Sequence, residues 1–85
     1  MTKFEVDIIW ETGLHARPAG EVVKLANTFK STIVFSNGDD SVDAKSILGV
    51  LTLGAVYQSK VFVTIEGDDE KDAETKLKKF FSSEF

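Results

Sequence analysis

Several residue types are absent or scarce in this chain of 85 residues, and each absence excludes a class of protein. There is no cysteine, which excludes disulfides and thiolate metal sites, and the single histidine excludes multi-histidine zinc sites. No apolar stretch approaches the roughly 20 residues of a membrane span, and Glu5 interrupts the N-terminus before any apolar signal core. We therefore expect a cytoplasmic protein without metal, cofactor or membrane insertion, held together by packing.

Basic residues are too few for a nucleic-acid surface. The chain has ten basic residues, counting lysine and arginine together, and fourteen acidic residues, which gives a net charge of −4. Because phosphate-backbone binding needs a basic face, nucleic acid is not expected as a partner. With 42% hydrophobic residues and a single proline, the chain is long enough for one globular domain, which we expect over residues 1–85. Trp10 and the seven phenylalanines are expected to fill or flank its core.

Hydrophobic periodicity predicts seven elements in the order βαββαβα. Alternation with a period of two indicates half-buried strands, and apolar spacings of three and four indicate amphipathic helices. The strands are expected at 3–10, 31–36, 41–43 and 61–66, and the helices at about 16–28, at 47–53 and after a turn at 67–70. One sheet with helices on one face follows. The first six elements also fit the ferredoxin-like pattern, so periodicity leaves two strand orders open.

The chain's only histidine, arginine and proline fall together at the start of the first predicted helix, as His15, Arg17 and Pro18. Free N–H groups and the positive end of the helix dipole make this position an anion site. The dipole disfavours the imidazolium cation, so the neutral, nucleophilic ring is favoured. A phosphoryl group on His15 would face the N–H groups of Ala16 and Arg17 and the Arg17 guanidinium. The spacing alone supports anion binding and does not distinguish binding from catalysis.

Two segments carry a family resemblance: Thr-Gly-Leu-His-Ala-Arg-Pro-Ala at 12–19 and Ala-Lys-Ser-Ile-Leu-Gly-Val-Leu-Thr-Leu-Gly at 44–54. The first resembles the active-site signature of the HPr family, the histidine-containing phosphocarriers of the bacterial sugar phosphotransferase system. The second resembles the family's regulatory-serine segment, at a matching separation. The resemblance covers essentially the whole chain. It implies an α+β open-faced β-sandwich, with a four-stranded antiparallel sheet and three helices on one face.

The resemblance also implies a carrier cycle, with no enzyme activity of its own. His15 would accept a phosphoryl group from phosphorylated Enzyme I, at Nδ1, and pass it to sugar-specific IIA domains. Since phosphoryl transfer depends mainly on alignment and charge stabilisation, Arg17 is the expected stabilising residue. The backbone N–H groups of Ala16 and Arg17 are expected to bind the phosphoryl group. A carrier that shuttles between partners is expected to be a monomer.

Ser46 has two compatible interpretations. Serine is a preferred N-cap, and the apolar helix that follows needs one. In HPr-like proteins of many bacteria, a kinase/phosphorylase modifies the serine at this position. A phosphate there would add a charge of about −1.5 to −2 and repel an acidic partner. The resemblance therefore adds an HPr kinase/phosphorylase and a carbon-control transcription factor to the expected partners.

The short helix holds more apolar side chains than one buried face requires, so some are expected to face solvent and form a partner surface. Val50 and Leu53 are the better core candidates. By resemblance, the docking residues are Ile47, Leu48 and Leu51 of this helix, with Ala16, Gly20, Lys24 and Asn27 along the first helix.

Three places depart from the family pattern: Gly20, the pair Leu48 and Leu51 where methionines are common, and the segment 55–60, which differs from the usual small, glycine-containing connection. Other functions also remain open. One is a regulatory adaptor that acts through Ser46-dependent binding, although the presence of His15 favours a carrier. Another is the phosphocarrier of the nitrogen-linked branch. The third is a ferredoxin-like binding module with an anion pocket, which a strand order would test.

Overall fold

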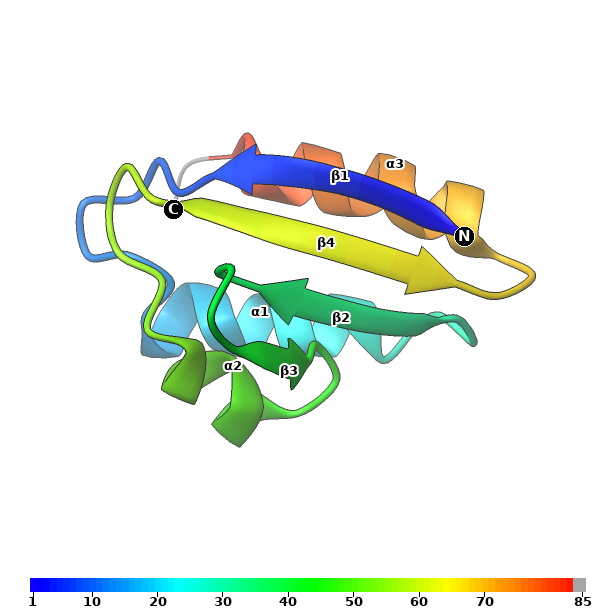
Figure 1. The fold of residues 1–85 in the computed structure, drawn as a ribbon, viewed down its shortest axis with the longest axis horizontal. Coiled ribbons are helices and arrows are strands. Elements are labelled where there is room, and N and C mark those ends of the chain that lie inside the picture. The colour runs from blue at the N-terminus through cyan, green and yellow to red at the C-terminus, as the bar shows by residue number, and fades with distance from the viewer. Residues whose placement is uncertain (84–85) are drawn as a thin grey trace.

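Four strands form one sheet, and the helices pack on one of its faces (Figure 1). The computed structural model describes residues 1–83. Its elements are β1 (Thr2–Asp7), α1 (Ala16–Ala26), β2 (Thr32–Ser36), β3 (Ser41–Asp43), α2 (Ile47–Leu53), β4 (Lys60–Glu66) and α3 (Glu70–Phe81). The predicted order and the open-faced sandwich are confirmed. Glu84 and Phe85, which the expected domain includes, lie outside the described residues.

The strand order decides between the two topologies that periodicity left open. The order is β1-β4-β2-β3, and each neighbouring pair is antiparallel. The edge strands are therefore β1 and β3, whereas the second and fourth strands form the edges of the ferredoxin-like sheet. This order excludes the ferredoxin-like module.

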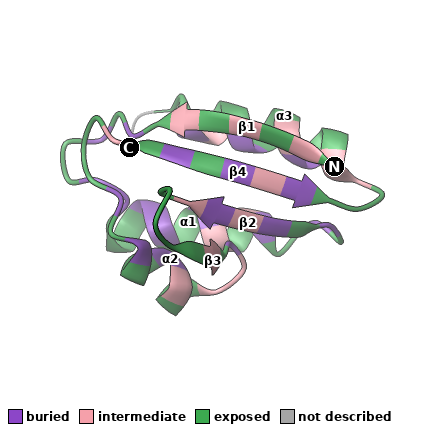
Figure 2. Ribbon diagram, viewed as in Figure 1, coloured by how far each residue is buried: buried purple, intermediate pink, exposed green. Residues whose placement is uncertain are grey.

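The core lies between the sheet and the helices. Alternate residues of β4 point inward, and Val61, Val63 and Ile65 are buried while Phe62 and Glu66 are exposed (Figure 2). Each helix adds a buried stripe to the same cluster: Ala19, Val22 and Ala26 from α1, Val50 and Leu53 from α2, and Ala73, Leu77 and Phe81 from α3. The core positions predicted for Val50 and Leu53 are confirmed. Phe62 is an exception among the phenylalanines of residues 1–83, because it lies on the outer face of the sheet.

Two predicted boundaries differ from the structure by more than one residue, each because of a hydrogen-bond partner. The first strand ends at Asp7 and does not reach residue 10, because the partner strand begins only at Lys60. Trp10 is nevertheless buried: its ring packs on Phe80 and Phe81, and its indole N–H donates to the Ser83 carbonyl at 2.7 Å.

The first helix ends at Ala26 and does not continue to residue 28. The Asn27 side chain donates to the Val23 carbonyl at 2.8 Å, and the Thr28 hydroxyl donates to the Leu25 carbonyl at 2.6 Å. Side chains thus satisfy carbonyls at the last turn, and the backbone tightens as Thr28 N–H donates to the same Leu25 carbonyl.

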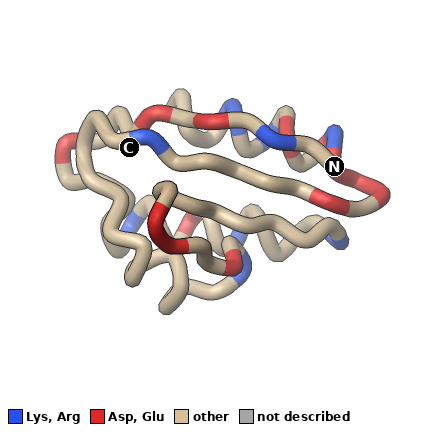
Figure 3. Tube along the Cα trace, in the orientation of Figure 1, with Lys and Arg blue, Asp and Glu red and all other residues tan. Residues whose placement is uncertain are grey.

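An acidic turn connects β4 to α3 (Figure 3). Asp69 is the N-cap residue of α3, but its carboxylate makes no capping hydrogen bond. The carboxylate instead accepts from the N–H of Lys30 at 2.8 Å, the N–H of Ser31 at 2.9 Å and the Ser31 hydroxyl. The hydrogen bond from the Ser31 hydroxyl is the largest cause of a lowered Asp69 pKa, followed by that from Lys30. Asp69 therefore ties the α1–β2 connection to the start of α3.

We expect the Asp69 contact to make folding stability depend on pH. Because the native pKa lies below the ordinary value of 3.8, the unfolded chain binds the proton more readily. The stabilisation is therefore present above that value and lost as the pH falls through the native pKa. Asp69→Asn should lower the free energy of unfolding at neutral pH and flatten its fall below about pH 4. Urea denaturation at a series of pH values measures both effects.

The exposed neighbour Asp68 supplies the matched control, since Asp68→Asn removes the same charge from the same turn. Part of the pH dependence of the free energy of unfolding should remain in Asp69→Asn, because the pKa of Glu70 is also lowered, mainly by a hydrogen bond from the Gly67 N–H. If the free energy of unfolding varies with pH in the same way in Asp69→Asn and Asp68→Asn, the Asp69 contact is not the cause of the pH dependence.

Candidate functional site

His15 is the N-cap residue of α1 and its side chain is exposed. Its backbone is extended, with φ −95° and ψ −171°. The His15 carbonyl accepts the helical N–H of Ala19 at 2.7 Å, while its side chain makes no capping hydrogen bond. The imidazole is therefore presented to solvent at the positive end of the helix.

The first turn of α1 leaves donors for an anion next to His15. Ala16 and Arg17 are the first two helical residues, and N–H groups at these positions have no intrahelical acceptor. Pro18 follows, buried and without an N–H, so it leaves no additional donor. The Arg17 side chain is exposed, and no ion pair within residues 1–83 includes it. Two N–H groups and one guanidinium can thus bind a phosphoryl dianion at this position.

The loop before His15 is held by the connection between α2 and β4. Gly13 N–H donates to the Trp10 carbonyl at 2.8 Å, and Leu14 N–H donates to the Ala55 carbonyl at 2.8 Å. Figure 1 shows the two loops side by side at one end of the sheet. Sequence reasoning missed Ala55, because no local pattern pairs it with Leu14.

Ser46 begins α2 at the opposite end of the α1–α2 pair. Its hydroxyl oxygen accepts from the Gly49 N–H at 3.1 Å, which confirms the predicted N-cap. The C-terminal end of α1 lies beside it, since Asn27 donates to the Lys45 carbonyl at 3.1 Å and the Lys45 ammonium donates to the Phe29 carbonyl at 2.8 Å. The seven residues of α2 span roughly 10 Å at 1.5 Å per residue. Because the loop before His15 contacts Ala55, just after the end of α2, about the length of α2 separates Ser46 from this loop.

The residues predicted for docking are all exposed, and the fold brings their two helices together. On α2, the exposed fractions are 44% for Ile47, 71% for Leu48 and 41% for Leu51. The α1 residues recur at spacings of four and three, which places them on one face of the helix: Ala16, Gly20, Lys24 and Asn27. These seven residues are called the docking face below.

Two residues of the docking face, Gly20 and Asn27, differ in what they contribute to the fold. Nothing lies within 4 Å of a Cβ placed on Gly20, so packing inside the described chain does not offset the roughly 1 kcal/mol that an interior helical glycine costs. Asn27 has a structural role as well, because its amide donates to the Val23 and Lys45 carbonyls.

Comparison with known proteins identifies the family of this chain. The sequence model of a family described as "PTS HPr component phosphorylation site" matches residues 2–83. The chain belongs to the HPr family. Members of this family are phosphocarriers of the phosphotransferase system and not enzymes, and the resemblance noted in the sequence is confirmed.

Solved HPr structures match over nearly the whole chain. The phosphocarrier protein HPr from Bacillus anthracis is 33% identical, with 93% of this chain and 94% of that chain covered and a TM-score of 0.88. HPr from Thermoanaerobacter tengcongensis is 37% identical over 100% of both chains, with a TM-score of 0.87. Crh of Bacillus subtilis, a catabolite repression protein described as a domain-swapped dimer, is 34% identical over 96% of this chain and 94% of that chain, with a TM-score of 0.76.

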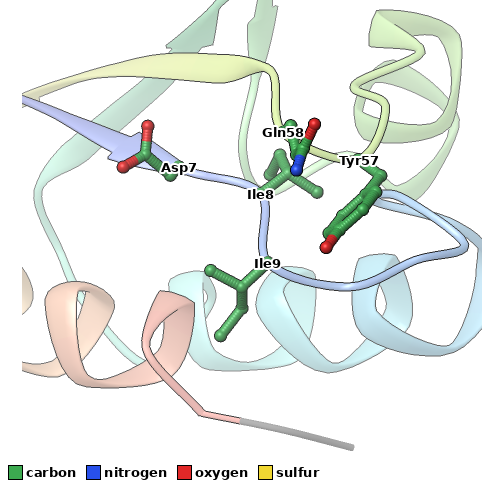
Figure 4. Close-up of a pocket in the computed structure, with 5 residues that line it drawn as sticks. All are labelled: Asp7, Ile8, Ile9, Tyr57 and Gln58. Atoms are coloured by element: carbon green, nitrogen blue, oxygen red, sulfur yellow. The ribbon is translucent and has the colours of Figure 1, made fainter.

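The segment that departs from the usual HPr pattern, 55–60, exposes apolar residues that sequence reasoning did not assign. Val56 is 63% exposed and Tyr57 is 46% exposed. Tyr57 and Ile9 line a hollow of about 310 Å³, together with Asp7, Ile8 and Gln58 (Figure 4). Gln58 has a positive φ of 68°, where glycine is more usual. The apolar run Ala55-Val56-Tyr57 is the signal in the sequence that could have identified this surface.

No helix within residues 1–83 combines the length and apolar character needed to cross a membrane. In the same described range, no three histidine or acidic side chains gather as a metal site.

Proposed function

We propose that this chain carries phosphoryl groups in a cytoplasmic relay, accepting them on His15 from phosphorylated Enzyme I and passing them to sugar-specific IIA domains. One observation carries the proposal: His15 is exposed at the N-cap of α1, beside the unpaired N–H groups of Ala16 and Arg17, and the exposed residue Arg17 lies in the same helical turn. Membership of the HPr family supports it.

In the proposed transfer, Nδ1 of the neutral imidazole attacks phosphorus in line with the bond to the donor residue. The new N–P bond forms as the donor bond breaks, and the electron pair of that bond returns to the donor. The N–H groups of Ala16 and Arg17 and the Arg17 guanidinium bind the phosphoryl oxygens, where the charge is spread in the transition state. Transfer to a IIA domain is the same step in reverse, with His15 as the leaving group.

The docking face is proposed to receive Enzyme I, IIA domains and an HPr kinase/phosphorylase. Leu48 is its most exposed apolar side chain, and Ser46 precedes α2 as its cap. A phosphate on Ser46 would add about −1.5 to −2 charge there and repel an acidic partner. The carrier is proposed to work as a monomer, because it must leave one partner before it binds the next.

A regulatory adaptor is the second candidate, and the likeness to Crh favours it. Such an adaptor would bind a carbon-control transcription factor after phosphorylation of Ser46. His15 distinguishes the candidates, since an adaptor that works only through Ser46 has no use for an exposed histidine beside an anion site.

Intact mass spectrometry tests the carrier proposal. The chain is incubated with phosphoenolpyruvate, magnesium and a heterologous Enzyme I, with His15→Ala as the matched control. We expect one acid-labile phosphoryl adduct on the unmodified chain and none on the variant. If a known HPr is labelled in the same tube while this chain is not, the result contradicts the carrier and favours the adaptor.

A further inference from the structure

A buried backbone hydrogen bond fixes the residue before His15. Leu14 N–H donates to the Ala55 carbonyl at 2.8 Å, and the two residues are only 3% and 7% exposed. Water cannot readily replace a partner in such a place, so this bond constrains the loop more than an exposed one would. Ala55 follows the C-cap of α2 and lies outside both the phosphoryl site and the docking face.

Gly13 allows the two backbones to approach. Its φ is +74°, and a Cβ on it would lie 2.6 Å from the Ala55 carbonyl oxygen and 3.1 Å from the Val56 Cα. The Gly13 carbonyl also accepts the His15 N–H at 2.9 Å. A displacement at Gly13 would therefore pass directly to the backbone of His15.

We propose that the Ala55 carbonyl and Gly13 position His15 for phosphoryl transfer, acting through the backbone of Leu14. The His15 side chain is exposed and makes no capping hydrogen bond, so the backbone is what sets the position from which the imidazole extends. In-line transfer needs the reacting atoms aligned, and a misplacement of about 1 Å can cost roughly 10²-fold in rate. The inference rests on the proposed function and adds two positioning residues to it.

Gly13→Ala is the first test, with Gly38→Ala as its matched control. Both glycines have a positive φ, but nothing lies within 4 Å of a Cβ on Gly38. Both variants strain the backbone, and only Gly13→Ala pushes against Ala55. At saturating carrier, the first-order rate of transfer from phosphorylated Enzyme I should fall about 10- to 100-fold in Gly13→Ala, with KM nearly unchanged. Gly38→Ala should transfer at the unmodified rate, and equal rates in the two folded variants would overturn the proposal.

If Gly13→Ala fails to fold, a backbone ester at Leu14 tests the positioning role instead. Replacing the Leu14 amide with an ester removes the N–H that Ala55 accepts. The matched control is an ester at Ala44, whose N–H donates to the Ile33 carbonyl at 2.9 Å. Both residues are buried, and both lie far from His15 in the sequence. Both esters should lower stability, whereas only the Leu14 ester should slow transfer. A Leu14 ester as fast as the Ala44 ester would overturn the positioning role.

Measuring the His15 adduct on the unmodified chain distinguishes failure of this inference from failure of the proposed function. Absence of a His15 adduct on the unmodified chain would overturn the proposed function, and this inference with it. A normal adduct, with Leu14 and Gly13 variants as fast as their controls, would overturn the positioning role alone.

Discussion

Replacing Arg17 with alanine is expected to slow phosphoryl transfer to His15 by about 10²- to 10³-fold, the usual cost of removing one donor that stabilises transition-state charge. The guanidinium is exposed and has no ion pair within residues 1–83, so its loss should leave the fold intact. Arg17→Lys should be intermediate, because the charge remains while the planar fork of donors is lost. Rapid-quench measurement of single turnover from phosphorylated Enzyme I gives the rates.

Lys3→Ala is a suitable control for the Arg17 variants. It removes a cation from the exposed edge strand β1, away from α1. Its transfer rate should match that of the unmodified chain. A wild-type rate in Arg17→Ala would show that the N–H groups of Ala16 and Arg17 stabilise the phosphoryl group without the guanidinium.

The second large effect is expected at Leu48, the most exposed apolar residue of the docking face at 71%. Leu48→Asp should raise the Kd for Enzyme I about 30-fold, which corresponds to a hot-spot loss of ~2 kcal/mol. The physical reason is that a carboxylate at the centre of an apolar contact must be desolvated without a partner. Calorimetric titration with Enzyme I, or the KM for the carrier, measures the change.

Phe62→Asp controls for the loss of an exposed apolar side chain. Phe62 is 44% exposed, but it lies on the outer face of the sheet, opposite Glu5 of β1. Its replacement should leave partner affinity unchanged. If Phe62→Asp and Leu48→Asp weaken binding equally, the contact is not centred on α2.

Most elements of the fold could be predicted because each buries one face, and a buried face imposes a period on the sequence. The alternation in β4 places Val61, Val63 and Ile65 in the core as expected. Boundaries were predicted less well, because they depend on hydrogen-bond partners that a hydrophobic period does not show. The first strand stops at Asp7 where its partner strand begins, and the first helix stops at Ala26 where the Asn27 side chain satisfies a carbonyl.

The local parts of the site were also predictable. His15 and Arg17 share one helical turn, and the bond from Gly49 to Ser46 joins residues within one turn. The contact between Leu14 and Ala55 was not predictable, since neither residue has a polar side chain that signals it. The contacts of the Asp69 carboxylate were not predictable either, because its partners, Lys30 and Ser31, lie far away in the sequence.

The sequence by itself determined the local part of the proposed site, because the proposed nucleophile, its donors and the Ser46 cap each lie within a single turn of helix. Only the tertiary structure decided the strand order, the antiparallel placement of α1 beside α2, and the carbonyl that holds the His15 loop. These features rest on hydrogen bonds and packing between segments far apart in the chain. Such contacts leave no local period or motif, so they become visible only when the core has brought the segments together.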